Sequence, residues 1–516
     1  MTKEDSQGIC GTCQGPASLK CTACGNVYYC SKEHQKKHWK IHKKECFPVV
    51  EQKDQQQGRY LVASRDIPAG HLILKEKPIV LGPPSISTAM CLGCLNPITQ
   101  PDFPKCPRCS WPLCSPVCAE SPLHAGECAY LSTDTGKKCP PQNLEETPRY
   151  DVILVLRCLA LREKKPDAWK TIESMVNYAE KYKKEEEPYH MATVKYISEI
   201  LTGVCDADLV HKVRGAIITN AINTKGPKGQ SFRGMYPKIY LLNHSCHPNV
   251  TLRSDIYGFL YINAAVDIKK GDPLLFSYIS PSLPLWQRQE ELQMNYNFIC
   301  TCVRCTDPTE LATYFSNPKC PKCHDSFLEP SQNYKDAWKC SKCGTTKPLK
   351  DLIKMADKFM ENIEAKSATV KDAAELLDNV NKDYHPKHYV WLTAAQAILR
   401  NLASNNEIEA LLIKRDLWES IVQLFFKLEP GTTRRRGVSL YHLACAEFEV
   451  FKAKKLLKQL SPSEYLAVLT NVLYRLDSAK EIITLEAEDS FERRWLKLLE
   501  EEREKINKIK EKLEES

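Results

Sequence analysis

Residues 241–250 read LLNHSCHPNV, an apolar run that ends in a carboxamide, an imidazole and a thiol. Asn, Ser and Pro are turn formers, so a surface turn with a chance cysteine is the simplest interpretation of this stretch. The alternative interpretation makes Cys246 a metal ligand. The spacing of the other cysteines in the chain distinguishes the two.

Size and composition predict a multidomain intracellular protein. The 516 residues are too many for one core and suggest about three or four units. Hydrophobic residues make up 43% and charged residues 26%, which is ordinary for a soluble globular protein. No run approaches the roughly 18 apolar residues of a membrane span, and the start MTKEDSQGIC lacks the apolar region of a secretory signal. We therefore expect a cytoplasmic or nuclear protein, or both, with no membrane contact.

The chain contains 25 cysteines, too many for a reducing compartment unless most of them bind metal. A Cys-x2-Cys turn points two thiolates at one ion, and ligands separated by three residues lie one helical turn apart. The first 46 residues contain four such pairs: Cys10 with Cys13, Cys21 with Cys24, Cys30 with His34, and His42 with Cys46. Eight ligands predict two zinc ions, which a segment with few large apolar residues needs in order to fold. Disulfides are the alternative, and the missing signal peptide argues against them.

Further cysteine groups follow along the chain. A second array repeats the order of the first: Cys91 with Cys94, Cys106 with Cys109, Cys114 with Cys118, and His124 with Cys128. A later group has the spacing of a four-cysteine zinc ribbon: Cys320, Cys323, Cys340 and Cys343. Between the two lies a trio that lacks a fourth ligand: Cys300, Cys302 and Cys305. Assigning Cys246 to the trio gives sets of four for about six zinc ions, on the basis of the count and not of spacing. Only Cys139, Cys158, Cys205 and Cys445 are left over.

These motifs together resemble a known family. Residues 10–46 resemble a MYND zinc finger, which implies two interleaved sites: one of Cys10, Cys13, Cys30 and His34, the other of Cys21, Cys24, His42 and Cys46. Four further stretches resemble a SET domain with its post-SET cysteines: GRYLVASRDIPAGHLI (58–73), NHSCHPNV, GDPLLFSY (271–278) and NFICTCVRC (297–305). A SET domain split by a MYND-like finger is typical of the SET-and-MYND (SMYD) lysine methyltransferases. A finger ahead of the SET start as well resembles the arthropod branch of that family.

The resemblance implies roles for individual residues. The SET core of this family binds S-adenosylmethionine on one side and a lysine in an aromatic channel on the other. Tyr278 matches the catalytic tyrosine, and Tyr296 resembles a wall of the channel. The implied cofactor-binding residues are Arg59, Asn220, Asn243, His244, Tyr278 and Phe298.

The chemistry of methyl transfer fits these roles. Displacement at a sulfonium methyl requires that the protein orient the lysine and remove its water. The amine must also be neutral, and an apolar channel lowers its pKa from about 10.4 by desolvation. A core tyrosine on a sheet is the alternative interpretation of Tyr278, and the surrounding motif favours the catalytic one.

The sequence departs from the family pattern at two places. The family opens the SET domain with Gly-x-Gly against the methionine end of the cofactor, whereas this chain has Gly58, Arg59 and Tyr60. The Tyr60 ring could fill cofactor space, because glycine permits a closer approach than any other residue. The family's acidic pair is replaced by Asp272 and Pro273, and proline suits only the start or the edge of a strand.

The remaining segments predict helices. Residues 145–220 carry amphipathic patterns and occupy the place of the family's helical insert. From 349 to 516 the chain reads as a helical C-terminal domain with pairs resembling tetratricopeptide repeats.

We predict a multidomain α+β protein in four parts, with zinc-rich MYND fingers, a β-rich SET domain with a pseudoknot, and a C-terminal α-helical domain. The parts are an N-terminal MYND finger (1–48), a SET domain (52–305), a zinc ribbon (306–348) and the helical domain (349–516). The SET domain is split by the second finger (91–128) and the helical insert, and it ends in the post-SET zinc motif.

Three hypotheses for function follow. The first is an S-adenosylmethionine-dependent protein-lysine N-methyltransferase, whose substrate is a histone or another regulatory protein in transcription. The second is a catalytically inactive adaptor whose MYND finger binds proline-containing peptides of transcriptional regulators. Tyr60 separates the two, because its ring is tolerated outside the cofactor site and disabling inside it. The third, DNA binding through residues 32–44, is disfavoured: the net charge of +8 is spread out, and Glu33 and Glu45 interrupt the basic cluster.

Overall fold

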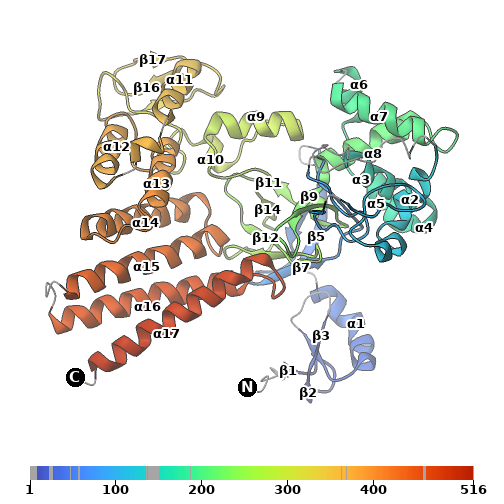
Figure 1. The fold of residues 1–516 in the computed structure, drawn as a ribbon, viewed down its shortest axis with the longest axis horizontal. Coiled ribbons are helices and arrows are strands. Elements are labelled where there is room, and N and C mark those ends of the chain that lie inside the picture. The colour runs from blue at the N-terminus through green and yellow to red at the C-terminus, as the bar shows by residue number, and fades with distance from the viewer. Residues whose placement is uncertain are drawn as a thin grey trace.

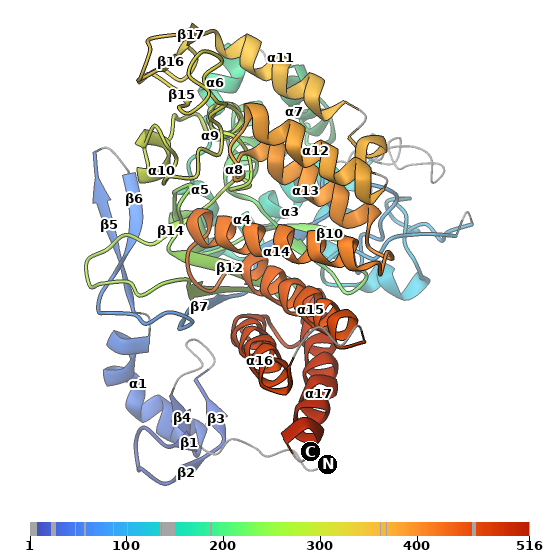
Figure 2. The same cartoon turned by 90° about the vertical axis from the view of Figure 1, so that its left-hand side faces the viewer.

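Strands in the middle of the molecule separate two helical regions (Figure 1). The helices of residues 150–220 lie on one side of these strands, and those from 349 onward lie on the other. The first finger and the zinc ribbon lie at opposite ends in both views (Figures 1 and 2). The predicted α+β multidomain class is confirmed. This computed structural model describes residues 8–21, 27–46, 48–55, 58–85, 87–100, 102–134, 136, 150–185, 188–361, 363–367, 369–456 and 461–514.

The first finger has almost no apolar core of its own. Its elements are β1 (Gly8–Ile9), β2 (Pro16–Ala17), β3 (Leu19–Lys20), β4 (Tyr28–Tyr29) and α1 (Lys32–Cys46). Its buried cluster consists of three cysteines with Ala17 and Tyr29. So small a cluster does not stabilise about 40 residues unaided, and the module needs its metal ligands to fold.

The central strands form several small sheets. They are β5 (Val49–Asp54), β6 (Gly58–Ala63), β7 (Leu72–Glu76), β8 (Val80–Gly82), β9 (Ile222–Lys225), β10 (Ser231–Met235), β11 (Asn243–His244), β12 (Val250–Ser254), β13 (Leu260–Ala264) and β14 (Leu275–Phe276). The order β12-β13-β7 is antiparallel, as is β8-β10-β9, and β5 and β6 form a hairpin. Aliphatic side chains from these strands build one core cluster beneath the loops described next.

Residues 241–250 pass beside the segment that leads to Tyr278. A short 3-10 helix, η3 (Ile239–Leu241), delivers the chain to β11, which pairs in parallel with β14. The Asn249 amide holds the two segments together, since its Nδ2 donates to the Pro273 carbonyl (2.8 Å) and its Oδ1 accepts from the Leu275 N–H (2.7 Å). Pro273 precedes β14 and forms an isolated antiparallel bridge with Val62, so the proline lies outside the regular strand.

The second finger and the helical insert share one core. The finger contains η1 (Pro116–Glu120) and α2 (Ala125–Leu131). The insert contains α3 (Asp151–Leu159), α4 (Leu161–Lys164), α5 (Pro166–Glu173), α6 (Ala179–Lys184), α7 (Pro188–Ile200) and α8 (Ala207–Asn220). Trp111 of the finger packs against Tyr150 at the start of α3, within a single buried cluster that continues through α7 and α8.

The chain after β14 builds the post-SET segment, the ribbon and a row of helices. Its elements are α9 (Leu285–Tyr296), α10 (Val303–Thr306), β15 (Leu328–Glu329), β16 (Trp338–Cys340), β17 (Thr346–Lys347), α11 (Leu349–Met360), η4 (Ala365–Ser367), α12 (Val370–Asp383), α13 (Tyr389–Asn401), α14 (Ile408–Leu428), α15 (Arg434–Leu456), α16 (Pro462–Thr484), η5 (Phe491–Arg493) and α17 (Arg494–Glu514). Within the described ranges no helix combines the length and apolarity that crossing a bilayer requires.

The helical domain attaches to the central strands through a buried ion pair. Arg253 of β12 donates to Glu486 (3.1 Å), and both side chains are 1% exposed. Arg434, at the start of α15, binds the other oxygen of the same carboxylate (2.7 Å). Beside them Gly431 has φ of +79°, and a Cβ there would lie 1.7 Å from the Ala265 carbonyl oxygen. Only glycine permits this approach of the two domains.

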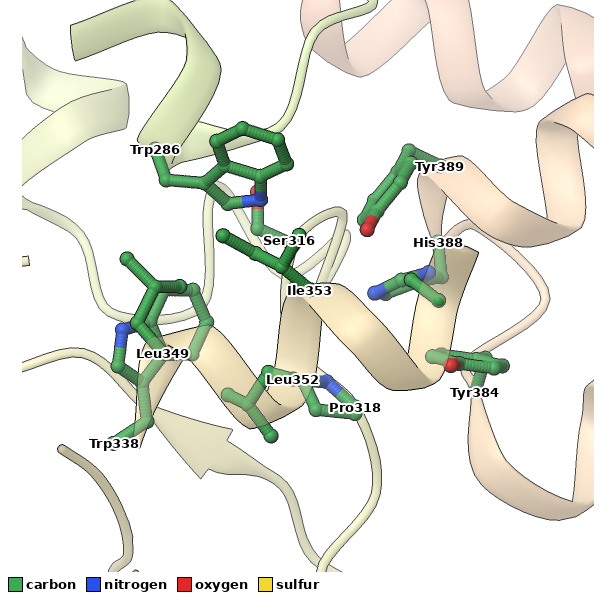
Figure 3. Close-up of a pocket in the computed structure, with 11 residues that line it drawn as sticks. Trp286, Ser316, Pro318, Trp338, Leu349, Leu352, Ile353, Tyr384, His388 and Tyr389 are labelled. Atoms are coloured by element: carbon green, nitrogen blue, oxygen red, sulfur yellow. The ribbon is translucent and has the colours of Figure 1, made fainter. Parts of the chain in front are cut away.

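A small pocket lies where α9, the ribbon and the C-terminal helices meet (Figure 3). Trp286 of α9, Trp338 of β16 and Leu352 of α11 form its apolar walls, and Tyr384 and Tyr389 close it from the helical domain. None of its lining residues belongs to the predicted cofactor or channel set. The pocket therefore marks a packing junction between domains.

Candidate active site and zinc centres

Four aromatic rings that the sequence analysis singled out lie together. The Tyr278 ring is 4.8 Å from that of Tyr296 and 5.1 Å from that of His244, between ring centroids. The Phe298 ring also lies close to His244, at 5.8 Å between centroids. These residues come from the end of β14, the end of α9 and β11, so the crossing of residues 241–250 past β14 is what brings them into one cluster.

Tyr278 is half-buried, and hydrogen bonds hold both its backbone and its hydroxyl. Its hydroxyl donates to the Leu242 carbonyl (2.5 Å), and its N–H donates to His244 Nδ1 (3.0 Å). Burial raises the pKa of Tyr278 well above its ordinary value of 10. The hydroxyl therefore keeps its proton at neutral pH, and it can orient a neighbouring group but cannot act as a base.

His244 links this cluster to the cysteines. Burial lowers the pKa of His244 to about 4, so the ring is neutral near pH 7. Because Nδ1 accepts from Tyr278, Nε2 carries the proton, and it lies 3.2 Å from the Cys246 sulfur. The imidazole thus joins the backbone of Tyr278 to a predicted metal ligand.

Arg59 and Tyr60, the residues expected at the methionine end of the cofactor, point in opposite directions. The Tyr60 hydroxyl donates to Gln52 Oε1 (3.4 Å) across the β5–β6 hairpin, so its ring lies on the outer, exposed face. The Arg59 side chain points to the opposite face. It donates to the Ser174 carbonyl (2.5 Å) and lies 5.3 Å from the ring of Tyr240, which is three residues before Asn243. Strand alternation explains the difference, because neighbouring side chains point to opposite faces.

Asn220 and Asn243, both predicted to bind the cofactor, occupy positions that support the backbone. Asn243 pairs with Leu275 in the β11–β14 ladder and is half-buried. Asn220 ends α8, and its Nδ2 donates to the carbonyls of Val176 and Ala216 (2.8 Å each). Asn220 therefore fixes the exit of the insert rather than joining the cluster of rings.

Cys246 does meet the trio at 300–305. The four sulfurs lie within 4.8 Å of one another, with Cys246 4.0 Å from Cys300 and 3.5 Å from Cys305. Zinc–sulfur bonds of about 2.3 Å in a tetrahedron place sulfurs about 3.8 Å apart, so the group fits a zinc ion. Gln289 of α9 fixes the backbone of Cys300 by a reciprocal pair of hydrogen bonds, each 2.8 Å.

The other cysteine arrays also gather into ligand groups of four. The groups are Cys10, Cys13, Cys30 and His34; Cys91, Cys94, Cys114 and Cys118; Cys106, Cys109, His124 and Cys128; and Cys320, Cys323, Cys340 and Cys343. Both fingers therefore interleave their ligands. For the second site of the first finger, Cys21 and Cys46 lie 3.6 Å apart, His42 is buried on α1, and Cys24 lies outside the described residues. Of the unassigned cysteines, Cys158 is buried, Cys205 and Cys445 are partly buried, and Cys139 lies outside the described residues.

A buried carboxylate supports the second finger. His124 Nδ1 donates to Glu127 (3.0 Å), which leaves Nε2 facing the Cys109 sulfur. Arg157 of α3 donates to the same carboxylate (2.9 Å) and to the Leu92 carbonyl (2.8 Å). A carboxylate behind a ligating histidine fixes its orientation, and here it also anchors the finger to the insert.

The buried polar residues around the post-SET cysteines were not predicted from the sequence. Gln289, Arg288, Arg304 and Glu310 are all buried. The available signal was weak: Arg304 lies within the C-x2-C turn of the trio, and Arg288 and Gln289 are neighbours on the helix leading to it. Charged residues in such places read as solvent-facing until the fold shows otherwise.

Comparison with known proteins agrees with this architecture. Residues 10–46 match the family model of the MYND finger, and residues 58–279 match that of the SET domain. SET domain-containing protein SmydA-8, isoform A, of Drosophila melanogaster is 26% identical over 350 residues, covering 65% of this chain and 74% of that protein. Histone-lysine N-methyltransferase ASHR1 of Arabidopsis thaliana is 23% identical over 435 residues, covering 78% and 88%.

Among solved structures, the SET domain of LSMT bound to lysine and AdoHcy aligns over 92% of both chains, at 12% identity and a TM-score of 0.30. The MYND match precedes the SET match along the chain, which is the order predicted from the first cysteine array and the NHSCHPNV stretch. The chain therefore contains a MYND finger (10–46) ahead of a SET domain (58–279).

Proposed function

We propose that this protein is a protein-lysine N-methyltransferase that uses S-adenosylmethionine and acts in the nucleus, the cytoplasm or both. The observation that carries the proposal is the half-buried cluster of Tyr278, Tyr296 and His244, with Phe298 beside His244. We expect its substrate to be a histone or another regulatory protein in transcription. The relative named above as a histone-lysine N-methyltransferase supports this expectation.

The chain's own residues suit the demands of the reaction. S-adenosylmethionine, when bound, supplies the methyl group on a sulfonium. The Tyr278 hydroxyl donates a hydrogen bond to the Leu242 carbonyl, so lone pairs of its oxygen are available to align the lysine amine. The rings of Tyr278 and Tyr296 exclude water, which favours the neutral amine over the ammonium.

The outward face of Tyr60 supports an open cofactor site. Its ring lies beside Gln52 on the hairpin's exposed face, whereas Arg59 reaches toward the segment before Asn243. The guanidinium of Arg59 would pair with the carboxylate of the bound cofactor at this place. Arg59, Asn243, His244 and Phe298 are the residues we propose to hold it, while Asn220 would support them through the end of α8.

Calorimetry of S-adenosylmethionine with the zinc-loaded chain, followed by a methylation assay on histone and nuclear protein mixtures, tests the proposal. Tyr278→Phe is the matched variant, because it removes one hydroxyl and keeps the ring. We expect cofactor binding in both proteins and at least about a hundredfold slower methyl transfer in Tyr278→Phe. Absence of cofactor binding in the natural protein would reject the enzyme hypothesis.

The adaptor function is the second candidate, and the first finger supports it. The finger lies at one end of the molecule (Figure 1) and exposes Ile9, Leu19, Trp39 and Ile41. Exposed apolar side chains of this kind suit short proline-containing peptides, which lose little entropy on binding. Binding of such peptides by a chain that does not bind S-adenosylmethionine would make the adaptor the leading function.

A further inference from the structure

Two arginines and one glutamate are fully buried beside the post-SET cysteines. Arg288 of α9 and Arg304 of α10 are each 0% exposed, and Glu310 is 1% exposed. Glu310 accepts from both guanidinium groups, at 2.8 Å from Arg288 and 2.9 Å from Arg304. One carboxylate thus serves two cations, and the group keeps one net positive charge.

A buried net charge is costly unless an opposite charge lies close by. The opposite charge is supplied on the cysteine side, where Arg288 Nη2 points at the Cys305 sulfur from 3.6 Å. A zinc ion held by four thiolates carries a net charge of −2, which is equally costly to bury alone. Each centre therefore supplies the charge that the other lacks.

The same two arginines hold the loop that follows Tyr278. Arg304 Nη1 donates to the Pro281 carbonyl (2.6 Å), and Arg288 Nη1 donates to the Leu283 carbonyl (2.8 Å). From the helical domain Arg435 adds a third grip, through the hydroxyls of Ser282 (2.8 Å) and Ser280 (3.1 Å). The loop is thus held by arginines from three separate elements.

We propose that Arg288 and Arg304 are positioning residues that balance the charge of the post-SET zinc centre and, through the backbone of residues 281–283, fix Tyr278. Loss of the metal would leave the pair with an uncompensated buried charge and release the loop. The importance of this for catalysis rests on the role of Tyr278 in the proposed function. The coupling between metal and loop does not depend on that role.

The test uses the full, zinc-loaded chain and two readouts that need neither cofactor nor methyl transfer. The first is the zinc remaining per chain during exposure to a strong chelator, measured by mass spectrometry. The second is hydrogen–deuterium exchange of the peptide spanning residues 279–284. In Arg288→Met we expect about one zinc ion per chain to be released at least about tenfold faster than in the natural protein. The loop peptide should exchange faster as well, as it should in Cys302→Ser, which removes a ligand of this centre.

Two further variants of the pair separate charge from shape. Arg288→Lys keeps the charge but cannot reach Leu283, Glu310 and Cys305 together. Its zinc release should therefore be faster than the natural rate and clearly slower than that of Arg288→Met. Arg304→Met keeps the contact of Arg288 with Cys305. We therefore expect the loop peptide to exchange faster in this variant, with less effect on zinc release than in Arg288→Met.

Arg253→Met is the matched control, because it breaks an equally buried ion pair whose partner is Glu486 and not a cysteine group. It should lower the thermal midpoint and leave zinc release unchanged. Zinc release at the natural rate in Arg288→Met, or equal acceleration in Arg288→Lys and Arg288→Met, would overturn the proposal, as would unchanged exchange of the loop. A chain that meets these expectations and yet binds no S-adenosylmethionine would refute the proposed function alone.

Discussion

Arg59 and Tyr60 are neighbours with opposite orientations, and this difference makes a direct prediction. Tyr60→Gly removes a ring from the outer face of the β5–β6 hairpin, so we expect S-adenosylmethionine affinity to stay within about twofold of the natural value. Arg59→Ala removes the cation that faces Tyr240 and Ser174. A lost hydrogen bond to a charged group costs about 1.5–3 kcal/mol, which corresponds to at least about tenfold weaker binding. Titration calorimetry of both variants checks it, and a large gain in affinity in Tyr60→Gly would place the ring inside the site.

For individual residues, the sequence predicts the metal ligands better than the residues that hold those ligands in place. The count of cysteines led to Cys246, and the structure brings that residue to the trio. Nothing comparable identifies Gln289 or Glu310, because their roles exist only once α9 and the segment after α10 lie against the same cysteines. A lone charged residue carries no spacing rule, whereas pairs of metal ligands do.

Glu76 gives β7 and η3 a pH-dependent connection. Its buried carboxylate accepts from the N–H groups of Lys238 (3.0 Å) and Ile239 (3.2 Å), and burial raises its pKa to about 7. Between its ordinary pKa of about 4.5 and 7, the folded state holds a proton that the unfolded state has lost. Stability therefore falls as pH rises through this window, by about 2–3 kcal/mol.

Glu76→Gln should remove this dependence, since the amide cannot ionise. Urea unfolding of the natural and variant chains between pH 5 and pH 7.5 measures it, using the transition reported by the central strands. Parallel pH profiles for the two proteins would contradict the assignment.

The first finger and the helical domain should respond oppositely to metal removal. The finger's buried cluster is little more than cysteines with Ala17 and Tyr29, whereas the helices from α11 onward bury two clusters of aliphatic and aromatic side chains. We expect a strong chelator to expose residues 8–46 to proteolysis while residues 369–514 stay protected. Mass spectrometry of the fragments checks the order, and readdition of zinc is the control. Simultaneous cleavage of both regions would show that the helices depend on the metals.

The sequence predicted the long helices more readily than the strands. Amphipathic periodicity identifies α14 or α17 from many residues at once, while β11 and β14 contain two residues each and carry no alternation to read. Their pairing depends on residues 241–250 crossing a segment about 30 positions later, and only the family resemblance suggested it.

At the scale of the whole molecule, docking of the helical domain depends on Gly431. Gly431→Ala would place a methyl group 1.7 Å from the Ala265 oxygen, beside the Arg253–Glu486 pair, and should separate the domains. Gly203→Ala is the control, because its φ of +77° is nearly the same and nothing lies within 4 Å. The control shares the backbone strain, about 1 kcal/mol, but not the clash. Small-angle scattering should show a larger radius of gyration for Gly431→Ala alone, and equal radii for both variants would contradict the argument.

The second finger and the helical insert interrupt a sheet, and this has a consequence for synthesis. β8 ends at Gly82, yet its partner β10 begins at Ser231, and Glu76 of β7 pairs opposite Leu260. A ribosome making about 5–20 residues per second leaves the early strands without partners for roughly ten seconds or more. During that delay the finger and insert, which share their own core, can fold as a unit and bring the two broken edges together. We therefore expect the interruption to serve as a nascent-chain scaffold, so that zinc shortage during translation lowers the yield of the finished sheet.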